Sequence, residues 1–242
     1  MKYLVALLFL TSVSHAGENT TLCKMSYEPG YENISSYAEG LNFMAKVLTQ
    51  SGCKVEVVPL PQKRGLEMLN KNVIDFSFGI TKAERKSGKP VLLSSFPFAH
   101  IKQKIAYVKT DKAFSFNKVP ELRGVTILNT FSLNQYADKH SLNLLEVRTP
   151  RQGLDMLLHG RVDYLIAADV IIQDLVEKNQ NIKKTVVTYP TTLTTEALYL
   201  GIGRRHISRV ETIEKNLKLA LAGDLAEYPH LRPLLNTTAK PE

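Results

Sequence analysis

The chain has 242 residues, of which 44% are hydrophobic and 22% are charged. These are ordinary values for a soluble globular protein, and the length suffices for one large domain or two small ones. The formal net charge is +8, but the basic residues are scattered and no aromatic–basic module occurs, so nucleic-acid binding is not predicted. A basic, solvated surface is the simpler interpretation, and it would attract an anionic ligand or partner.

Residues 1–16 predict a cleaved secretory signal peptide. Lys2 supplies the positive start, Tyr3–Leu10 the apolar core, and Ser14-His15-Ala16 a small-residue cleavage site. The apolar core is too short to span a bilayer, which takes about 20 residues. We therefore expect the mature protein to be exported and soluble.

Strand and helix patterns alternate through the first half of the mature chain. Apolar residues at i, i+4, i+7 and i+11 predict one face of a helix, and they are Tyr37, Leu41, Met44 and Leu48. The other elements predicted in this half are strands at Thr21–Tyr27 and Val55–Val58, a helix at Gln62–Asn70, and strands at Ile74–Phe78 and Ile105–Val108.

The second half continues the alternation, which predicts an α/β protein. Strands are expected at Val125–Leu128, Leu144–Val147, Thr185–Thr188 and Ala197–Ile202, and helices through Tyr136, over Arg151–His159 and Val170–Lys178, and around Ile213 and Leu217. No internal repeat is evident by residue identity.

Two stretches carry a recognisable order of residues. The first contains Leu69, Asn72-Val73-Ile74-Asp75, Thr81, Arg85 and Ser95-Phe96-Pro97-Phe98, and the second contains Leu122-Arg123-Gly124-Val125 and Gly160-Arg161-Val162-Asp163. This order resembles the periplasmic solute-binding proteins of the amino-acid type (extracellular solute-binding protein family 3), which serve ABC importers. That family shows a Leu-rich helix, Gly-x-x-Asp, a strand, Thr-x-x-Arg and then Phe-Ser-x-Pro-Tyr/Phe.

The resemblance implies a type II periplasmic-binding-protein fold with two lobes, each a mostly parallel sheet flanked by helices. Lobe 1 would comprise residues 17–108 and 193–242, and lobe 2 residues 112–188. The two hinge crossings would lie at 109–111 and 189–192. A monomer would bind its ligand between the lobes and close around it.

The chain has two cysteines, Cys23 and Cys53. A single pair in an exported chain predicts one disulfide, with two buried thiols as the alternative. In the resembled fold, the strands next to these cysteines are neighbours. A bridge closing a loop of about 30 residues would contribute roughly 3–4 kcal/mol.

The resemblance also assigns a lobe-1 side of the ligand site. Arg85 would hold a ligand carboxylate with its planar guanidinium, helped by backbone N–H groups between Gly79 and Thr81. Tyr27 and Tyr31 would contact the ligand side chain. The alternatives are a solvated basic loop for Arg85 and surface tyrosines in the loop after the first strand.

In lobe 2, Thr130 and Ser132 would add hydroxyl groups and the positive end of a helix, or would serve only as helix caps. The acid that binds a ligand ammonium in the family would fall on Ala168, and the nearest acid is Asp169. A shift of one residue turns a strand side chain to the other face, so Asp169 would reach the ligand only at a bulge or strand end. Thr81 and Arg85 also lie one residue further apart than in Thr-x-x-Arg.

These features predict periplasmic binding of a small solute, an amino acid or related carboxylate, for an ABC permease. No cofactor or metal is expected, since the chain lacks catalytic motifs and its histidines do not cluster. The first alternative is a lyase resembling dehydratases of cyclohexadienyl acids, with a cleft acid such as Glu28 or Asp169. The second is a stand-alone sensor, which a neighbouring kinase gene rather than a permease gene would indicate.

Overall fold

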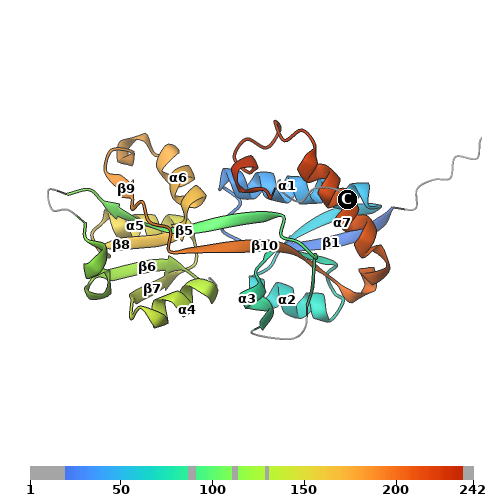
Figure 1. The fold of residues 1–242 in the computed structure, drawn as a ribbon, viewed down its shortest axis with the longest axis horizontal. Coiled ribbons are helices and arrows are strands. Elements are labelled where there is room, and N and C mark those ends of the chain that lie inside the picture. The colour runs from blue at the N-terminus through green and yellow to red at the C-terminus, as the bar shows by residue number, and fades with distance from the viewer. Residues whose placement is uncertain (1–19, 87–90, 111–113, 129–130, 237–242) are drawn as a thin grey trace, which may run out of the picture.

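A computed structural model describes residues 20–86, 91–110, 114–128 and 131–236, and the predicted signal peptide lies outside these ranges. The molecule is elongated and consists of two groups of helices and strands placed side by side (Figure 1). Two long strands, β5 (Ala99–Val108) and β10 (Thr194–Ile202), run between the groups. No helix among the described residues is long and apolar enough to cross a membrane.

The described strands form one ten-stranded sheet in the order β2-β1-β3-β10-β5-β8-β6-β7, with β4 beside β10 and β9 beside β5. Read from its two ends, each half is three parallel strands followed by one antiparallel long strand. The α/β prediction is confirmed. The remaining strands are β1 (Thr21–Tyr27), β2 (Cys53–Pro59), β3 (Phe76–Ile80), β4 (Leu92–Leu93), β6 (Arg123–Ile127), β7 (Asn143–Val147), β8 (Tyr164–Ala168) and β9 (Val186–Thr188).

Helices flank both halves of the sheet (Figure 1). The α-helices are α1 (Ser35–Gln50), α2 (Gln62–Asn70), α3 (Lys82–Lys86), α4 (Phe131–Lys139), α5 (Pro150–Leu158), α6 (Asp169–Glu177) and α7 (Val210–Ala222). Short 3-10 turns occupy η1 (Phe116–Glu121), η2 (Gln180–Ile182), η3 (Arg204–Arg209) and η4 (Arg232–Leu234).

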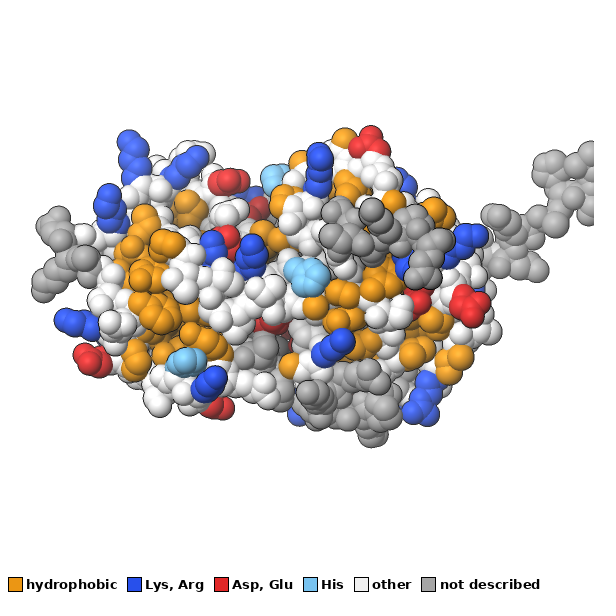
Figure 2. Space-filling model, viewed as in Figure 1, with side chains coloured by type: hydrophobic (Ala, Val, Ile, Leu, Met, Phe, Trp, Pro, Cys, Tyr) orange, Lys and Arg blue, Asp and Glu red, His pale blue; other side chains and the backbone are white. Residues whose placement is uncertain are grey.

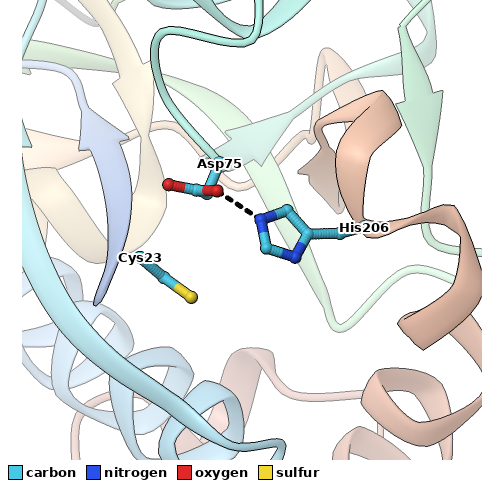
Figure 3. A group of neighbouring side chains, drawn as sticks. All are labelled: Cys23, Asp75 and His206. Carbon is cyan, nitrogen blue, oxygen red and sulfur yellow. Dashed lines mark hydrogen bonds and ion pairs between the residues drawn. The ribbon is translucent and has the colours of Figure 1, made fainter. Parts of the chain in front are cut away.

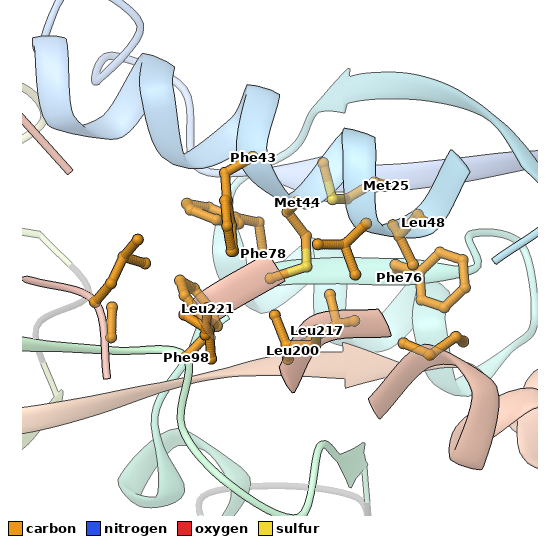
Figure 4. Packing of buried hydrophobic residues seen from close by; sticks show 14 of the residues in the cluster. Met25, Phe43, Met44, Leu48, Phe76, Phe78, Phe98, Leu200, Leu217 and Leu221 are labelled. Atoms are coloured by element: carbon orange, nitrogen blue, oxygen red, sulfur yellow. The ribbon is translucent and has the colours of Figure 1, made fainter. Parts of the chain in front are cut away.

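The larger hydrophobic core lies where α1 and α7 cover the first half of the sheet. Phe43, Met44 and Leu48 of α1 point into the same space as Leu217 and Leu221 of α7 (Figure 4). All five side chains are buried. Burying a side chain of this size stabilises the fold by about 1.5–3 kcal/mol, so the apolar face predicted from the sequence is what fixes α1 to the sheet.

The same corner is built once in each half of the sheet. Asn72 and Gly160 follow the helices α2 and α5 with positive φ angles of 56° and 65°, a conformation that glycine and asparagine tolerate best. Three residues later comes an aspartate, Asp75 or Asp163, that forms two hydrogen bonds with one strand residue. The N–H of Asp75 donates to the carbonyl of Lys24, and the Asp75 carboxylate accepts from the N–H of Lys24. Asp163 forms the same two bonds with Arg123. The two halves are therefore equivalent in structure although they share little sequence.

The predicted disulfide between Cys23 and Cys53 is present, with 5.6 Å between the Cα atoms. The two cysteines are buried on adjacent parallel strands. The bridge ties the edge strand β2 to β1 beneath α1.

The two halves are joined through β5 and β10, which pair antiparallel from Ala99–Leu198 to Gln103–Thr194. From Gln103 onward, β5 also pairs with β8, so it joins the second half before it reaches the predicted crossing at 109–111. The lobe and hinge boundaries drawn from the resemblance stay predictions.

The halves also touch beyond the sheet, at the start of α1. The N–H of Ser35 donates to the Asp174 carboxylate of α6 over 3.0 Å, and Lys178 donates to the carbonyl of Asn33. Asp174 thus caps a helix of the other half, which satisfies a donor that α1 leaves open. These contacts hold the halves close together.

Candidate ligand-binding cleft

A cavity of about 150 Å³ lies between the two halves of the sheet. Its walls are formed where β1, β3, β6 and β8 end and where β5 and β10 cross. Open α/β sheets bind ligands at the carboxyl ends of their strands. The position of this cavity is therefore the expected one for a ligand site.

The described part of the cavity has two unlike walls. The wall from the second half is apolar and consists of Ile127, Leu128, Ala167, Ala168, Val170 and Ile171. The wall from the first half and the crossing strands carries three carboxylates, Glu28, Glu84 and Glu196. No Lys or Arg occurs among the described lining residues; the Arg85 side chain lies outside the described part.

Gln62, the first residue of α2, links two of these carboxylates. Its backbone N–H donates to Glu28 over 2.5 Å, and its side-chain amide donates to Glu84 over 3.1 Å. Glu28 follows the last residue of β1, so the strand end and the helix start hold it together. Burial raises the pKa of Glu28, and the hydrogen bond from Gln62 opposes the rise.

Glu84 is held by Thr81 at the start of α3. Its Oε2 accepts hydrogen bonds from the Thr81 backbone N–H, over 2.6 Å, and from the hydroxyl, over 2.9 Å. The N–H of Glu84 donates back to the Thr81 hydroxyl, which completes a capping box. Burial raises the pKa of Glu84 to about 7 against these hydrogen bonds, with a further contribution from Glu196 and Glu28.

Glu196 comes from the crossing strand β10 and faces Gln103 of β5. The Gln103 amide donates to Oε1 of Glu196 over 3.3 Å. Both side chains belong to the buried set, at 8% and 4% exposure. The crossing strands therefore place a carboxylate directly beside the cavity.

Tyr31 lines the cavity among the carboxylates and packs against Tyr37, with 5.3 Å between ring centroids. Burial raises the pKa of Tyr31, and the charges of Glu28, Glu196 and Glu84 raise it further. Its hydroxyl therefore stays protonated and can donate or accept a hydrogen bond.

The structure brings three of the residues predicted from the resemblance to the cavity: Gly79, Thr81 and Tyr31. Gly79 has a φ of 73°, which explains a glycine at the end of β3. Tyr27 does not line the cavity but packs behind Tyr37, with 6.5 Å between ring centroids.

None of the predicted lobe-2 residues is found at the described part of the cavity. Asp169 does not line the cavity; it forms an ion pair with Lys104 over 3.0 Å, and Ala168 lines the cavity instead. Asp169 is the first residue of α6, and no bulge turns it inward. Thr130 and the side chain of Ser132 lie outside the described residues, as does the Arg85 side chain, although Arg85 belongs to α3.

Sequence reasoning missed Glu84, Glu196, Gln62 and Gln103. One signal was available: Thr81 and Glu84 have the Thr-x-x-Glu spacing of a capping box. The spacing also places Glu84 three residues after Thr81, where the resembled family has its Arg. A single Glu within a short strand such as β10 gives no comparable signal.

A second cluster of polar side chains lies away from the cavity and consists of Cys23, Asp75 and His206 (Figure 3). Its ligand atoms lie within 4.8 Å of one another, but the sulfur of Cys23 is bonded to Cys53, so it cannot act as a thiolate ligand. Asp75 instead accepts hydrogen bonds from Arg205 and His206. The cluster is structural and fixes η3 to β1 and β3.

Known proteins resemble this chain in structure but not detectably in sequence. No protein-family model and no curated protein matches the sequence. The substrate-binding protein of an amino-acid ABC transporter superposes with a TM-score of 0.66 at 16% identity, covering 88% of this chain and 96% of that chain. The chain has the type II periplasmic-binding-protein fold.

Two further structures have this fold. An ancestral arginine-binding protein bound to arginine superposes with a TM-score of 0.65 at 20% identity, over 83% of this chain and 92% of that chain. An ancestral amino-acid-binding protein, a precursor of cyclohexadienyl dehydratase, superposes with a TM-score of 0.61 at 20% identity, over 82% and 88% of the two chains. The fold therefore hosts both binding proteins and a forerunner of an enzyme.

Proposed function

We propose that this protein binds a small solute, an amino acid or a related molecule, in the cavity between the halves of its sheet. The solute would be delivered to an ABC importer from the periplasm, where the predicted signal peptide would direct the chain. We infer that the protein acts by binding and not by catalysis. Solved neighbours that bind amino acids support this proposal.

The cavity is the observation that carries the proposal. It lies where the parallel strands of both halves end, and it is lined by buried polar side chains together with apolar ones. Ligand pockets typically combine a mostly apolar wall with a few convergent polar groups. The buried Glu196 lies beside this cavity, and a ligand there would offset the free-energy cost of burying a polar group.

Closure would complete the site. We propose that the lobes are 17–108 plus 193–242 and 112–188, as the resemblance implies, and that the crossings run through β5 and β10. Bending of these two strands would bring the apolar wall onto a ligand already held by the carboxylates. Water would then leave the cavity.

A thermal-shift screen of the mature protein tests the proposal. The panel holds amino acids, small dicarboxylates, short peptides, polyamines and sugars, each at about 1 mM. A ligand with a micromolar dissociation constant adds about 4 kcal/mol at this excess, which corresponds to roughly 8–16 °C for a chain of this size. A shift with one compound class is the expected result, and no shift across the panel would contradict solute binding.

A lyase is the second candidate, and Glu84 favours it. This cleft carboxyl has a pKa raised to about 7, which suits a general acid at neutral pH. In a dehydratase it would protonate the hydroxyl group, which leaves as water while the carboxylate on the ring leaves as CO2 and its C–C bonding electrons complete the aromatic ring. Incubation with a cyclohexadienyl acid, followed by absorbance of the aromatic product, tests this candidate; product formation that Glu84→Gln abolishes would establish it.

A stand-alone sensor would use the same cavity. A receptor and a sensor both bind a ligand, so the thermal-shift screen gives the same result for each. Co-purification with a permease from the native membrane would support the transport role. Co-purification with a kinase would support the sensor instead.

A further inference from the structure

We propose that the ligand of this cavity presents a cationic group, an ammonium or a guanidinium, to Glu28, Glu84 and Glu196. The inference rests on the proposed solute binding and specifies the chemical class of the solute. It reverses the polarity implied by the family resemblance, in which lobe 1 holds the ligand carboxylate and lobe 2 its ammonium.

Glu196 is the first reason. Its side chain is more than nine-tenths buried and lines the cavity. Oε1 accepts one hydrogen bond, from the neutral amide of Gln103, and no described residue donates to Oε2. A carboxylate has about four acceptor positions, so described residues use only a small part of its hydrogen-bonding capacity beside the cavity. A cation there would satisfy it.

The two other carboxylates extend the same surface. Glu28 accepts a hydrogen bond from Gln62 with one oxygen, and no described residue donates to its other oxygen. Glu84 shares Gln62 with Glu28. The hydroxyl of Tyr31 lies in the field of all three carboxylates and has no described hydrogen-bond partner. The described donors to Glu28 and Glu196 are the neutral amide groups of Gln62 and Gln103, so no described cation faces these two carboxylates.

Among its described residues, the opposite wall offers no carboxylate for a cation. Its described residues are apolar, and the nearby Asp169 is paired with Lys104. Apolar groups such as Ile127, Leu128 and Ile171 would pack against the alkyl part of a ligand. A small molecule with a cationic end and an aliphatic body therefore fits both walls at once.

Isothermal titration calorimetry with matched ligand pairs tests the inference on the mature protein. In each pair one member carries more cationic groups: arginine one more than citrulline, putrescine two more than 1,4-butanediol, and alanine one more than lactate. The proposal predicts that the cationic member of at least one pair binds about 10- to 100-fold more tightly, the effect of one hydrogen-bonded charge. Succinate serves as a ligand without any cation.

Glu196→Gln and Glu28→Gln locate the effect. Each should weaken the binding of the more cationic ligand about 10-fold or more and should change the binding of 1,4-butanediol or lactate little. Glu56→Gln is the matched control, because Glu56 is exposed on β2 and its loss changes the net charge equally. If Glu196→Gln fails to fold, as its melting curve would show, Glu28→Gln decides alone.

The possible results distinguish the proposal of solute binding from the proposal that the solute is cationic. Tight binding only of succinate, lactate or 1,4-butanediol, none of which carries a cation, would overturn the cationic class and leave solute binding intact. Unchanged affinity in both variants would do the same. Binding of no compound in the thermal-shift panel or in these pairs would overturn both.

Discussion

Glu84 lies three residues after Thr81, the spacing at which the resembled family has its Arg, whereas Arg85 lies one residue further on. Glu84 is hydrogen-bonded to Thr81 and lines the cavity. A carboxyl group at this place would favour the proposed cationic ligand, since specificity depends on complementary charge.

The protonation of Glu84 should be visible in the stability of the ligand-free protein. Its pKa of about 7 lies above the ordinary 4.5, so the folded protein retains a proton that the unfolded chain has released. Stability should therefore fall as the pH rises from about 4.5 to 7, by at most about 3 kcal/mol. Urea unfolding at a series of pH values measures this fall.

Glu84→Gln should flatten that part of the pH profile, whereas Glu56→Gln should leave it unchanged. Among the described residues, the titratable groups that act on Glu84 or are acted on by it are Glu28, Glu196 and Tyr31. Carboxyl groups near it could share the proton, so Glu28→Gln should lower the midpoint of the fall without removing it. An unaltered profile in Glu84→Gln would assign the titration elsewhere.

The role that the resemblance implies for Arg85, binding a ligand carboxylate, stays a prediction. If it holds a ligand carboxylate, Arg85→Ala should weaken a carboxylate ligand about 10- to 100-fold without changing the melting temperature. Lys86→Ala is the control for a general loss of positive charge. Equal affinity in the two variants would remove Arg85 from the site.

The residue pattern predicted part of the cavity and missed the part that sets its charge. Gly79, Thr81 and Tyr31 were found because the motif fixes a strand end and the loop near it. Glu196 could not be found, because whether a strand residue faces a cavity depends on how β5 and β10 cross. That crossing is a tertiary fact that local spacing does not encode.

At the scale of elements, the repeated corner shows why two unlike stretches fold alike. A residue that tolerates positive φ ends the helix, and an aspartate three residues later holds the neighbouring strand. The corner depends on these two residues, the one with positive φ and the aspartate. The rest of each stretch is free to differ, so comparison by identity did not reveal the repeat.

The two aspartates of this corner form a natural matched pair. Asp163 is exposed, and Asp163→Ala should cost about 1 kcal/mol for the lost hydrogen bond. Asp75 is 1% exposed and also accepts hydrogen bonds from Arg205 and His206. Asp75→Ala would leave those partners unpaired, and should cost about 3–5 kcal/mol. Urea unfolding compares them; equal losses would contradict a structural role for the larger cluster.

The disulfide gives a second prediction at this scale. Cys23→Ala and Cys53→Ala should each lower the free energy of unfolding by about 3–4 kcal/mol, because each change opens the same 30-residue loop. The double variant should lose little more than either single one. Additive losses would show that side-chain packing, rather than the cross-link, stabilises β1 and β2.

Most elements were predictable because their residues alternate or recur with a clear period. The largest differences occur in the crossing strands: β5 begins at Ala99 rather than Ile105, and β10 begins at Thr194 rather than Ala197. Both segments pass between the halves and include polar residues beside the cavity, such as Gln103 and Glu196. Their alternation therefore does not follow the buried-and-exposed rule of an ordinary strand.

At the scale of the whole molecule, net charge is a poor guide to the site. The chain carries +8, and its Lys and Arg side chains are spread over the visible face rather than gathered (Figure 2). The described cavity lining is acidic instead. The expectation of an anionic ligand rested on the summed charge, and a buried site responds mainly to the groups within a few ångströms of it.

The proposed closure of the two halves would be a property of the whole molecule. The structure shows the halves in contact through Asp174, which is 9% exposed, accepts the N–H of Ser35 and pairs with Lys178 over 2.8 Å. Burial alone would raise the pKa of Asp174, but the hydrogen bonds from Lys178 and Ser35 outweigh it and lower the pKa. The carboxylate therefore holds the start of α1 against α6 at neutral pH.

Asp174→Ala should favour the open form, because α1 would lose its only described cap from the other half. We expect a larger radius of gyration in solution scattering and a ligand affinity about 10-fold lower, since part of the binding energy would be spent on closing. Asp155→Ala, which removes an exposed ion pair within α5, is the control. Ligand should shrink the wild type and the control alike. A variant as compact as the wild type without ligand would show that the crossing strands alone set the closed form.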